Sequence, residues 1–424
     1  MNTAVALLQP DAVFPQRDLL LEPDFIAEKL AARLEDRIQV HMKSCERVRA
    51  TYRPGQSFRV SYKFRANGAD GIVAARAFGT SAHTSELDSS TGLSNPAWDT
   101  GFFDRETNTA FWLFPSDRKI KSLPQLMQEP YTVSDPFVSG WVESRLMAYA
   151  SEKCATVQCL DRERNVLAYA KVYAGDEGFN CFEIYNALSS ACDQGRFSVP
   201  RALAYSSVHH ILLLEAIAGV RIADLADEQL ENAIRGLGKA VATLHSTPLS
   251  ASIPTFTRFE PKRLKEIAEG IALVRPDVEE IALRLSDALC STANDRSDSV
   301  VWLHGDVHPK NAIIRQGKMT LIDLDQAAAG PAAADVGSFL ALLRYDVITG
   351  SVSRELECRL KHAFLSGYQA CGELPEDTQL RWFTAVALFA ERAARAVSRI
   401  RQKGLEYLRD LLVESQQILD GKDA

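Results

Sequence analysis

Hydrophobic and polar positions divide the chain into a strand-rich first half and a helical second half. Alternating segments predict an antiparallel meander with strands at 48–52, 57–64 and 72–78, preceded by a helix at 27–39. A second meander is predicted at 145–149, 154–160 and 166–174. Past residue 178 the spacing becomes helical, interrupted by short strands around 201–205 and 209–215, with helices expected at 180–190, 234–244, 262–271, 278–289, 354–365, 382–400 and 407–419. This order predicts an α+β protein with two lobes and a cleft between them.

The two meanders align as an internal repeat. An offset of 149 − 52 = 97 residues places Tyr52 on Tyr149 and Val60 on Val157. After a gap of two residues, Arg76 falls opposite Lys171. We expect a duplicated hairpin in which only one copy keeps a working lysine, and chance similarity between alternating strands is the alternative.

Composition and charge narrow the classes of function. The chain has 424 residues, of which 46% are hydrophobic and 24% charged, as in an ordinary globular protein of two or three packed units. The net charge of −7 gives no general attraction to nucleic acid or anionic membranes, so small partners, including cationic ones, are expected. No apolar run approaches the roughly 20 residues of a membrane helix, and the first residues lack a signal-peptide pattern, which predicts a cytoplasmic protein. The eight cysteines show no metal spacing, so reduced thiols are expected.

One segment carries the candidate chemistry. An apolar strand at 300–303 leads to His304 and Asp306, Asn311 follows five residues after Asp306, and a short hairpin then ends on Asp323. Magnesium-dependent phosphoryl transfer needs such a set, because one carboxylate orients an acceptor hydroxyl while hard oxygen ligands hold the ion against the phosphates. A single Asp in a loop is more often a turn former, but the combination favours chemistry.

The sequences HGDVHPKN, IDLD and GPAAAD within this segment resemble the protein-kinase-like superfamily. Within it, they are similar to the aminoglycoside phosphotransferase and choline kinase group. The resemblance implies ATP and Mg²⁺ as cofactors. It implies the following roles: Asp306 as catalytic base, His304 as the structural histidine of the loop, Lys310 near the transferred phosphate, Asn311 and Asp323 as magnesium ligands assisted by Asp325, and Asp335 as a brace for the loop.

The same resemblance implies a lysine on the nucleotide phosphates, paired with a glutamate of the following helix. Lys171 is similar to that lysine, with Glu183 as its natural partner and Glu177 as a weaker candidate. Lys63 in VSYKF is the rival, although the chain from it to Asp306 is too long unless a whole insert intervenes. A solvated lysine on an edge strand is the structural alternative for Lys171.

The adenine hinge and the phosphate loop are less distinct. The segment around Glu215, Ala216 and Ile217 resembles the hinge whose backbone groups pair with the adenine. No glycine-rich motif occurs between the strands at 145–149 and 154–160, although Ser151 in the turn offers a hydroxyl to a phosphate.

Together these features predict a bilobal protein-kinase-like fold, with an antiparallel-sheet N-lobe at 141–218, a helical C-lobe at 219–424 and an extra α+β region at 1–140. The expected activity is transfer of the γ-phosphate of ATP to a hydroxyl of a small molecule, namely a sugar, an aminoglycoside or an amino alcohol. Two alternatives remain open: a catalytically inactive nucleotide-binding or scaffold protein, and a separate recognition function of the N-terminal region. The oligomeric state is not predicted. The arginines of 392–401 are expected on a solvated or helix-pairing face.

Overall fold

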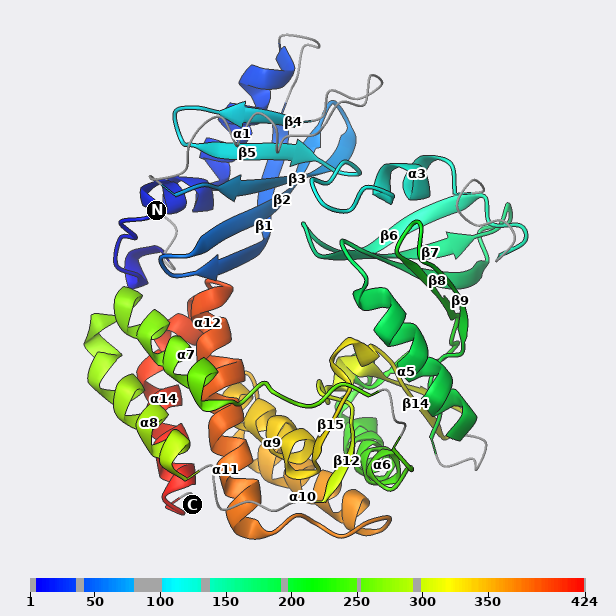
Figure 1. Ribbon diagram of the computed structural model, residues 1–424, viewed down its shortest axis with the longest axis vertical. Coiled ribbons are helices and arrows are strands. Elements are labelled where there is room, and N and C mark those ends of the chain that lie inside the picture. Colours follow the sequence, from blue (N-terminus) through cyan, green and yellow to red (C-terminus); the bar gives the residue numbers. More distant parts are fainter. Residues whose placement is uncertain are drawn as a thin grey trace.

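The computed structural model describes residues 5–35, 42–79, 101–130, 138–191, 197–249, 253–292 and 299–422. Figure 1 shows two antiparallel sheets above a helical lobe, with the first sheet over the C-terminal helices and the second over α5. No helix in these ranges is long and apolar enough to cross a membrane. Seven of the eight cysteines lie in them, all as free thiols, and Cys192 lies outside.

The first sheet has the strand order β1-β2-β3-β5-β4. It is preceded by three short 3₁₀ turns and one helix. The elements are η1 (Val5–Leu7), η2 (Pro15–Arg17), η3 (Leu19–Leu21), α1 (Pro23–Glu35), β1 (Met42–Arg53), β2 (Ser57–Ala66), β3 (Ala69–Ala77), β4 (Gly101–Asp104) and β5 (Thr109–Leu113). Along β2 one face is apolar and buried, with Phe58, Val60, Tyr62 and Phe64, whereas Lys63 and Arg65 on the other face are exposed.

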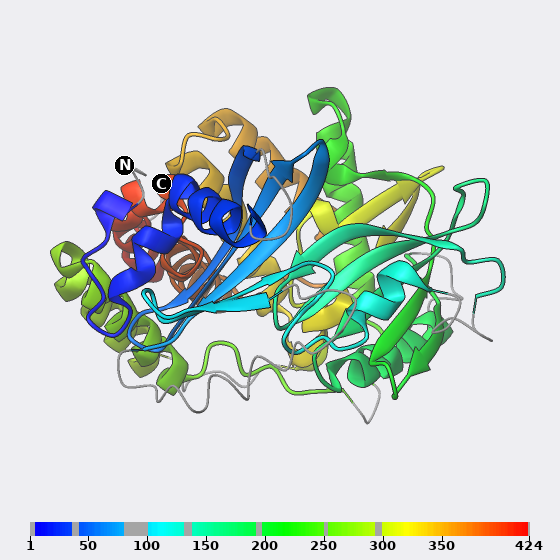
Figure 2. The ribbon, with the colours of Figure 1, turned by 90° about the horizontal axis from the view of Figure 1, so that it is seen from above.

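The second sheet has the order β6-β7-β8-β10-β9. It is flanked by α3 (Leu123–Gln128) on one side and by α5 (Glu177–Ala191) on the other. The strands are β6 (Glu143–Ala150), β7 (Cys154–Leu160), β8 (Val166–Tyr173), β9 (Ala202–Ser206) and β10 (Ile211–Glu215). Seen from above, the two sheets adjoin (Figure 2), and the indole of Trp112 in the first donates to the hydroxyl of Tyr149 in the second at 3.0 Å.

The two sheets repeat one another in strand order and in register. Tyr52 pairs with Phe58 in the first sheet, and Tyr149 pairs with Ala155, both 97 residues further on (52 + 97 = 149 and 58 + 97 = 155). Similarly, Arg59 pairs with Arg76, whereas the equivalent position, 59 + 97 = 156, pairs with Lys171. Arg76 thus occupies in the first sheet the position that Lys171 has in the second.

The helical lobe begins after β10. Its elements are β11 (Val220–Arg221), η5 (Ile222–Asp224), α6 (Asp227–His245), α7 (Pro261–Val274), η6 (Pro276–Val278), α8 (Glu279–Ser291), β12 (Val300–Leu303), η7 (Pro309–Asn311), β13 (Ala312–Arg315), β14 (Lys318–Leu321), η8 (Leu324–Gln326), β15 (Ala328–Pro331), α9 (Ala333–Ile348), α10 (Arg354–Gln369), α11 (Asp377–Ala387), the π-helix η9 (Leu388–Ala393), α12 (Ala394–Ser398), α13 (Gln402–Glu406) and α14 (Leu408–Leu419).

The N-terminal region is anchored to the end of the chain. One hydrophobic core joins buried side chains of the first sheet, such as Phe58, to those of the C-terminal helices, such as Leu264 and Leu411. The guanidinium of Arg399 donates to the Thr51 hydroxyl at 2.8 Å, which adds a polar link between the end of α12 and β1. Burying this much apolar surface makes the N-terminal region part of the fold rather than a tethered appendage.

The fold agrees with the predicted class, and two local predictions were wrong. The turn expected at 65–71 is a two-residue hairpin, because Asn67 and Gly68 both adopt positive φ and the strands continue to them. Strand β4 lies between residues 78 and 109, where no strand was predicted, and pairing with β5 outweighs the weak local pattern there. The boundaries 1–140, 141–218 and 219–424 stay a prediction, although α3 packs on the second sheet.

Candidate active site

The loop after β12 is held by a buried carboxylate. Asp335 accepts from the backbone N–H groups of His304 at 2.6 Å and Gly305 at 2.8 Å, and lies 3.2 Å from His245 Nε2. Burial alone would raise the pKa of Asp335, but these donors, His245 foremost, hold it below its ordinary value. Gly305 is required, since it has φ +76° and an added Cβ would lie 2.0 Å from the Gln326 carbonyl oxygen.

His304 orients the rest of the loop. Its ring is buried, and its Nε2 lies 3.0 Å from the carbonyl oxygen of Ile322. A proton on Nε2 satisfies that acceptor and leaves Nδ1 to accept from the Asp306 N–H at 3.3 Å. The histidine therefore connects the loop after β12 to the end of the β13–β14 hairpin, which fits the structural role that the resemblance implies.

Asp306 and Asn311 are in direct contact. The amide Nδ2 of Asn311 donates to Asp306 Oδ2 and to the Asp306 carbonyl, both at 3.0 Å. The Asn311 carbonyl accepts from the Ile322 N–H at 2.9 Å, which brings Asn311 beside the strand end that carries Asp323. Asp306 is partly exposed, as a group that receives a proton from a substrate must be.

Lys171 crosses from the second sheet to this strand end. Its ammonium lies 2.5 Å from Asp323 Oδ1 and 2.6 Å from Asp325 Oδ1. Burial lowers the pKa of Lys171, but the carboxylates outweigh burial and raise it well above its ordinary value. The same contact outweighs burial at Asp323 and lowers the pKa of that carboxyl. Lys171 is therefore a largely buried cation on an inner strand, held by two carboxylates, and not a solvated lysine on an edge strand.

The expected pairing of Lys171 with Glu183 is absent from the described residues. Glu183 lies two positions beyond Cys181 on α5, about 200° around the helix, and it is Cys181 and Tyr185 that face the lysine. The phenol of Tyr185 is buried and accepts from the Leu324 N–H at 3.3 Å. A second phenol, that of Tyr173, donates to Asp325 at 3.2 Å.

These aromatic and thiol neighbours were not predicted. Their only signal is spacing, since Tyr173 stands two positions after Lys171 on one strand face and Cys181 stands four before Tyr185 on one helix face. Because Asp325 accepts from Lys171 and Tyr173 together, its oxygen is turned toward β8.

The remaining candidates lie around this centre. Lys310 is exposed at the end of the loop, and its N–H donates to His308 Nδ1 at 3.1 Å. Glu215 ends β10, where its side chain contacts Arg201 at 3.2 Å, and Ile217 follows in the connection to β11. The rival Lys63 points to Asp70 at 3.6 Å on the far hairpin, with 59% of its side chain exposed, so it takes no part in the centre.

The donor set suits a magnesium ion. Asn311 and Asp323 offer a side-chain amide oxygen and a carboxylate on neighbouring strand ends, and such hard oxygen ligands are those that Mg²⁺ takes. In the described parts of the chain no three His, Cys, Asp or Glu side chains converge as a metal site. Two protein ligands still fit Mg²⁺, because it keeps waters and phosphate oxygens as its other ligands.

The turn between β6 and β7 is locked by the first sheet. Glu152, at its tip, is buried with φ +59° and binds three arginines: Arg59 at 3.1 Å, Arg76 at 2.5 Å and Arg118. The N–H of Glu152 also donates to Asp117 at 2.9 Å. A turn that lacks glycine is thus fixed by charge, and sequence reasoning missed this clamp because its members lie up to 93 residues apart.

Comparison with known proteins agrees with this geometry. Residues 181–383 match the model of the phosphotransferase enzyme family. A thermostable mutant of the aminoglycoside phosphotransferase APH(4)-Ia is similar over 69% of this chain and 99% of its own, with 14% identity and a TM-score of 0.52. Amicoumacin kinase, solved with AMP-PNP, Ca²⁺ and its antibiotic, is similar over 71% and 96%, with 15% identity and a TM-score of 0.50.

No match was found among curated proteins. The family match, over residues 181–383, includes the loop that carries His304, Asp306 and Asn311. The resemblance read from the HGDVHPKN segment and the predicted fold class are both confirmed. Residues 181–383 therefore match the phosphotransferase enzyme family, within a chain that has the protein-kinase-like fold of the aminoglycoside phosphotransferases.

Proposed function

We propose that this chain transfers the γ-phosphate of ATP, with Mg²⁺, to a hydroxyl group of a small molecule. One observation carries the proposal: Lys171 contacts Asp323, Asn311 contacts Asp306, and the backbone of Ile322, next to Asp323, bonds to that of Asn311, so the four residues lie together between the second sheet and the loop after β12. Each member is a residue type that phosphoryl transfer needs, and each comes from a different element.

Asp306 is the proposed base. The acceptor oxygen attacks the γ-phosphorus as its proton passes to the Asp306 carboxylate, and the bond to the oxygen bridging the β- and γ-phosphates breaks to release ADP. Asn311 donates to Asp306 Oδ2, which fixes the carboxylate and leaves Oδ1 for the hydroxyl. Asp335 and His304 hold the loop backbone so that this geometry exists before substrate binds.

Lys171 is the proposed phosphate ligand, and Asn311 with Asp323 would hold Mg²⁺, which offsets charge on the phosphates when bound. In the structure Lys171 is paired with Asp323 and Asp325, so nucleotide binding would exchange part of that pairing for phosphate oxygens. Glu215 and Ile217 at the end of β10 are proposed to flank the adenine, by resemblance, and Lys310 to lie near the transferred phosphate.

A coupled ADP-release assay tests the proposal. The purified chain is screened with ATP and Mg²⁺ against sugars, phosphorylated sugars, sugar acids, aminoglycosides and amino alcohols. We expect turnover with one class, its loss with EDTA, and a fall of about 10³-fold in kcat for Asp306→Asn. Asp70→Asn, an exposed carboxylate of the first sheet, is the matched control and should keep wild-type activity.

The second candidate is a nucleotide-binding protein without catalysis. It is favoured by the double ion pair of Lys171, which occupies the oxygen that a metal would use, and by the lack of a glycine-rich turn. Thermal stabilisation by Mg·ATP without turnover of any acceptor would support it. If Mg·ATP neither stabilises the chain nor is hydrolysed, both candidates fail.

A further inference from the structure

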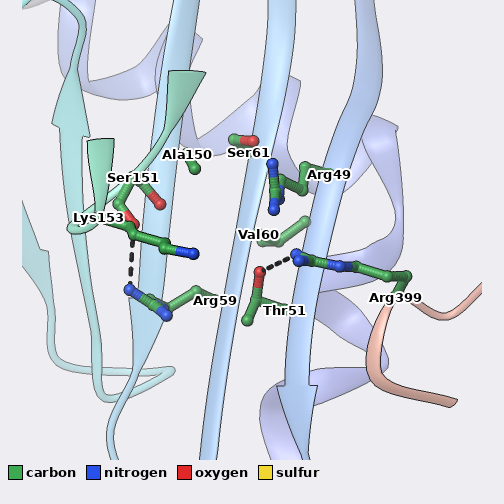
Figure 3. A pocket seen from close by; sticks show the side chains of 9 residues that line it. All are labelled: Arg49, Thr51, Arg59, Val60, Ser61, Ala150, Ser151, Lys153 and Arg399. Carbon is green, nitrogen blue, oxygen red and sulfur yellow. Dashed lines mark hydrogen bonds between the residues drawn. The ribbon is translucent and has the colours of Figure 1, made fainter. Parts of the chain in front are cut away.

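A basic hollow lies between the first sheet and the transfer site. Its walls come from β1 and β2, from the β6–β7 turn and from the end of α12, and its cavity volume is about 50 Å³. The residues that line it are Arg49, Thr51, Arg59, Val60, Ser61, Ala150, Ser151, Lys153 and Arg399. Figure 3 shows the side-chain ends of Arg49, Lys153 and Arg399 turned toward the same space.

The charge of this hollow is unbalanced. Four of its residues are basic, and none is acidic. Glu152, between Ser151 and Lys153 of the lining, is already shared by three arginines, of which Arg59 is one. Among the described residues, the side chains of Arg49 and Lys153 have no hydrogen-bond or ion-pair partner. In a chain of net charge −7, such a concentration of cations requires a local reason.

The arginines also repel one another. Burial first, and then Arg49 and the arginines of the α12 end, lower the pKa of Arg399 to about 10. Burial, followed by Arg59 and Arg401 among the like charges, lowers that of Arg49 in the same way. Like charges gathered in a part-buried hollow destabilise the protein unless an anion binds between them. Arg399 is held in position by its bond to Thr51, and this makes the site preorganised.

The hollow adjoins the proposed base. Arg395 and Arg399 are successive residues of one helix face, since the Arg399 N–H donates to the Arg395 carbonyl at 3.0 Å, and they are about 6 Å apart along the axis. Arg395 Nη1 lies 4.0 Å from Asp306 Oδ1. Arg399, which lines the hollow, is thus one helical turn from Arg395, whose guanidinium lies beside the base.

We propose that this hollow binds an oxyanion, a phosphate or a carboxylate, carried by the acceptor itself. The inference rests on the proposed function and names its substrate class: an anionic hydroxylated small molecule rather than a polycation. An oxyanion at this site places the acceptor between the first sheet and α12, with its hydroxyl toward Asp306. The overall charge led to the expectation of cationic partners, whereas the local charge of the hollow favours an anionic partner.

The nucleotide is the other possible source of an oxyanion, since the β6–β7 turn stands where the family covers the phosphates. Binding of inorganic phosphate to the full chain separates the two sources. We expect phosphate to raise the melting temperature saturably and to add to the stabilisation given by saturating Mg·AMP-PNP. If Mg·AMP-PNP displaces phosphate, the hollow serves the nucleotide and the inference is wrong.

Charge variants locate the phosphate. Arg49→Gln should weaken phosphate binding at least about tenfold, because a charge-assisted hydrogen bond is lost. Lys153→Gln, an exposed position, should weaken it too, which covers the case in which Arg49→Gln does not fold. Arg65→Gln, paired with Asp70 on the far end of β2, is the matched control and should bind as wild type. Equal binding by all variants, or no saturable binding, overturns the inference.

Failure of this inference is distinguishable from failure of the proposed function. Asp306→Asn should abolish turnover yet bind phosphate as wild type, because phosphate binding needs no catalytic base. In the acceptor screen, phosphorylated sugars or sugar acids should be turned over in preference to their uncharged counterparts. Turnover of cationic or uncharged acceptors alone would refute the anionic substrate class while supporting the phosphotransferase.

Discussion

The two sheets share strand order and register but use their equivalent cations differently. Lys171 in the second sheet contacts Asp323 and Asp325 in the cleft, whereas Arg76 in the first sheet contacts Glu152 of the neighbouring turn. The register shows that these two side chains stand at the same position of the repeat. One copy thus supplies a cation to the proposed chemistry, and the other supplies a cation to the turn beside it.

The difference suggests how a kinase-like cleft functions without a glycine-rich turn. A glycine-rich loop approaches phosphates closely through its backbone, at the cost of conformational entropy. Here the turn has side chains, and its shape is fixed by a buried glutamate bound to three arginines, two of them from the first sheet. The first sheet therefore helps to fix the shape of this turn through charge, in place of a glycine-rich backbone.

The largest expected effect is a difference in activity between variants of Lys171 and variants of Arg76. Lys171→Ala should reduce kcat/KM for ATP by about 10²- to 10³-fold, since a preorganised charge on the phosphates is lost. Arg76→Ala, its counterpart in the repeat, should keep activity within about tenfold, because Arg59 and Arg118 still bind Glu152. Steady-state kinetics decide, and equal losses would remove the distinction between the sheets.

Replacing Glu152, the glutamate shared by three arginines, should lower the free energy of unfolding. Glu152→Gln leaves three arginines around a neutral group, and breaking a buried ion pair costs about 3–5 kcal/mol in the free energy of unfolding. Glu163→Gln, in the β7–β8 turn of the second sheet, is the matched control, since Glu163 is exposed. Urea unfolding measures both, and a Glu152→Gln variant as stable as the control would show that the clamp is unimportant.

Replacing Arg76 by lysine, or Lys171 by arginine, should have a smaller effect on stability and activity. Arg76→Lys keeps the charge but loses the planar fork, so we expect a loss of about 1 kcal/mol in unfolding free energy and little change in kcat. Lys171→Arg should leave stability nearly unchanged and lower kcat/KM, because the bulkier guanidinium must fit between two carboxylates. Urea unfolding and kinetics on both variants measure this, and the reverse pattern would contradict the assigned roles.

The smallest effect is a pH dependence. Burial would raise the pKa of Glu152, but Arg76 and Arg118 outweigh it and hold the pKa below its ordinary 4.5. The folded protein then binds fewer protons than the unfolded chain below pH 4.5, so the stabilisation is complete above that pH and is lost as pH falls through the folded pKa. The stability difference between wild type and Glu152→Gln should therefore narrow below pH 4.5, and a constant difference would exclude an ionised Glu152.

The fold, and the proximity of Lys171, Asp306, Asn311 and Asp323, could be predicted from the sequence because both depend on local signals. Alternating strands, the repeat offset and the spacing from Asp306 to Asn311 and Asp323 are all legible along the chain. The partner of Lys171 could not be predicted from the sequence, because the rotation of α5 about its axis decides whether Cys181 or Glu183 faces the lysine. The Glu152 clamp and the contact of Arg395 with Asp306 also escaped, since they join residues distant in sequence.

The most direct test is a crystal structure of the chain with AMP-PNP and Mn²⁺, whose anomalous signal locates the metal. We predict that the ion lies between Asn311 and Asp323, and that the phosphates lie beside Lys171, under the second sheet. A nucleotide bound beside Arg76, or a metal remote from Asn311 and Asp323, would contradict the assignment of the phosphotransfer site.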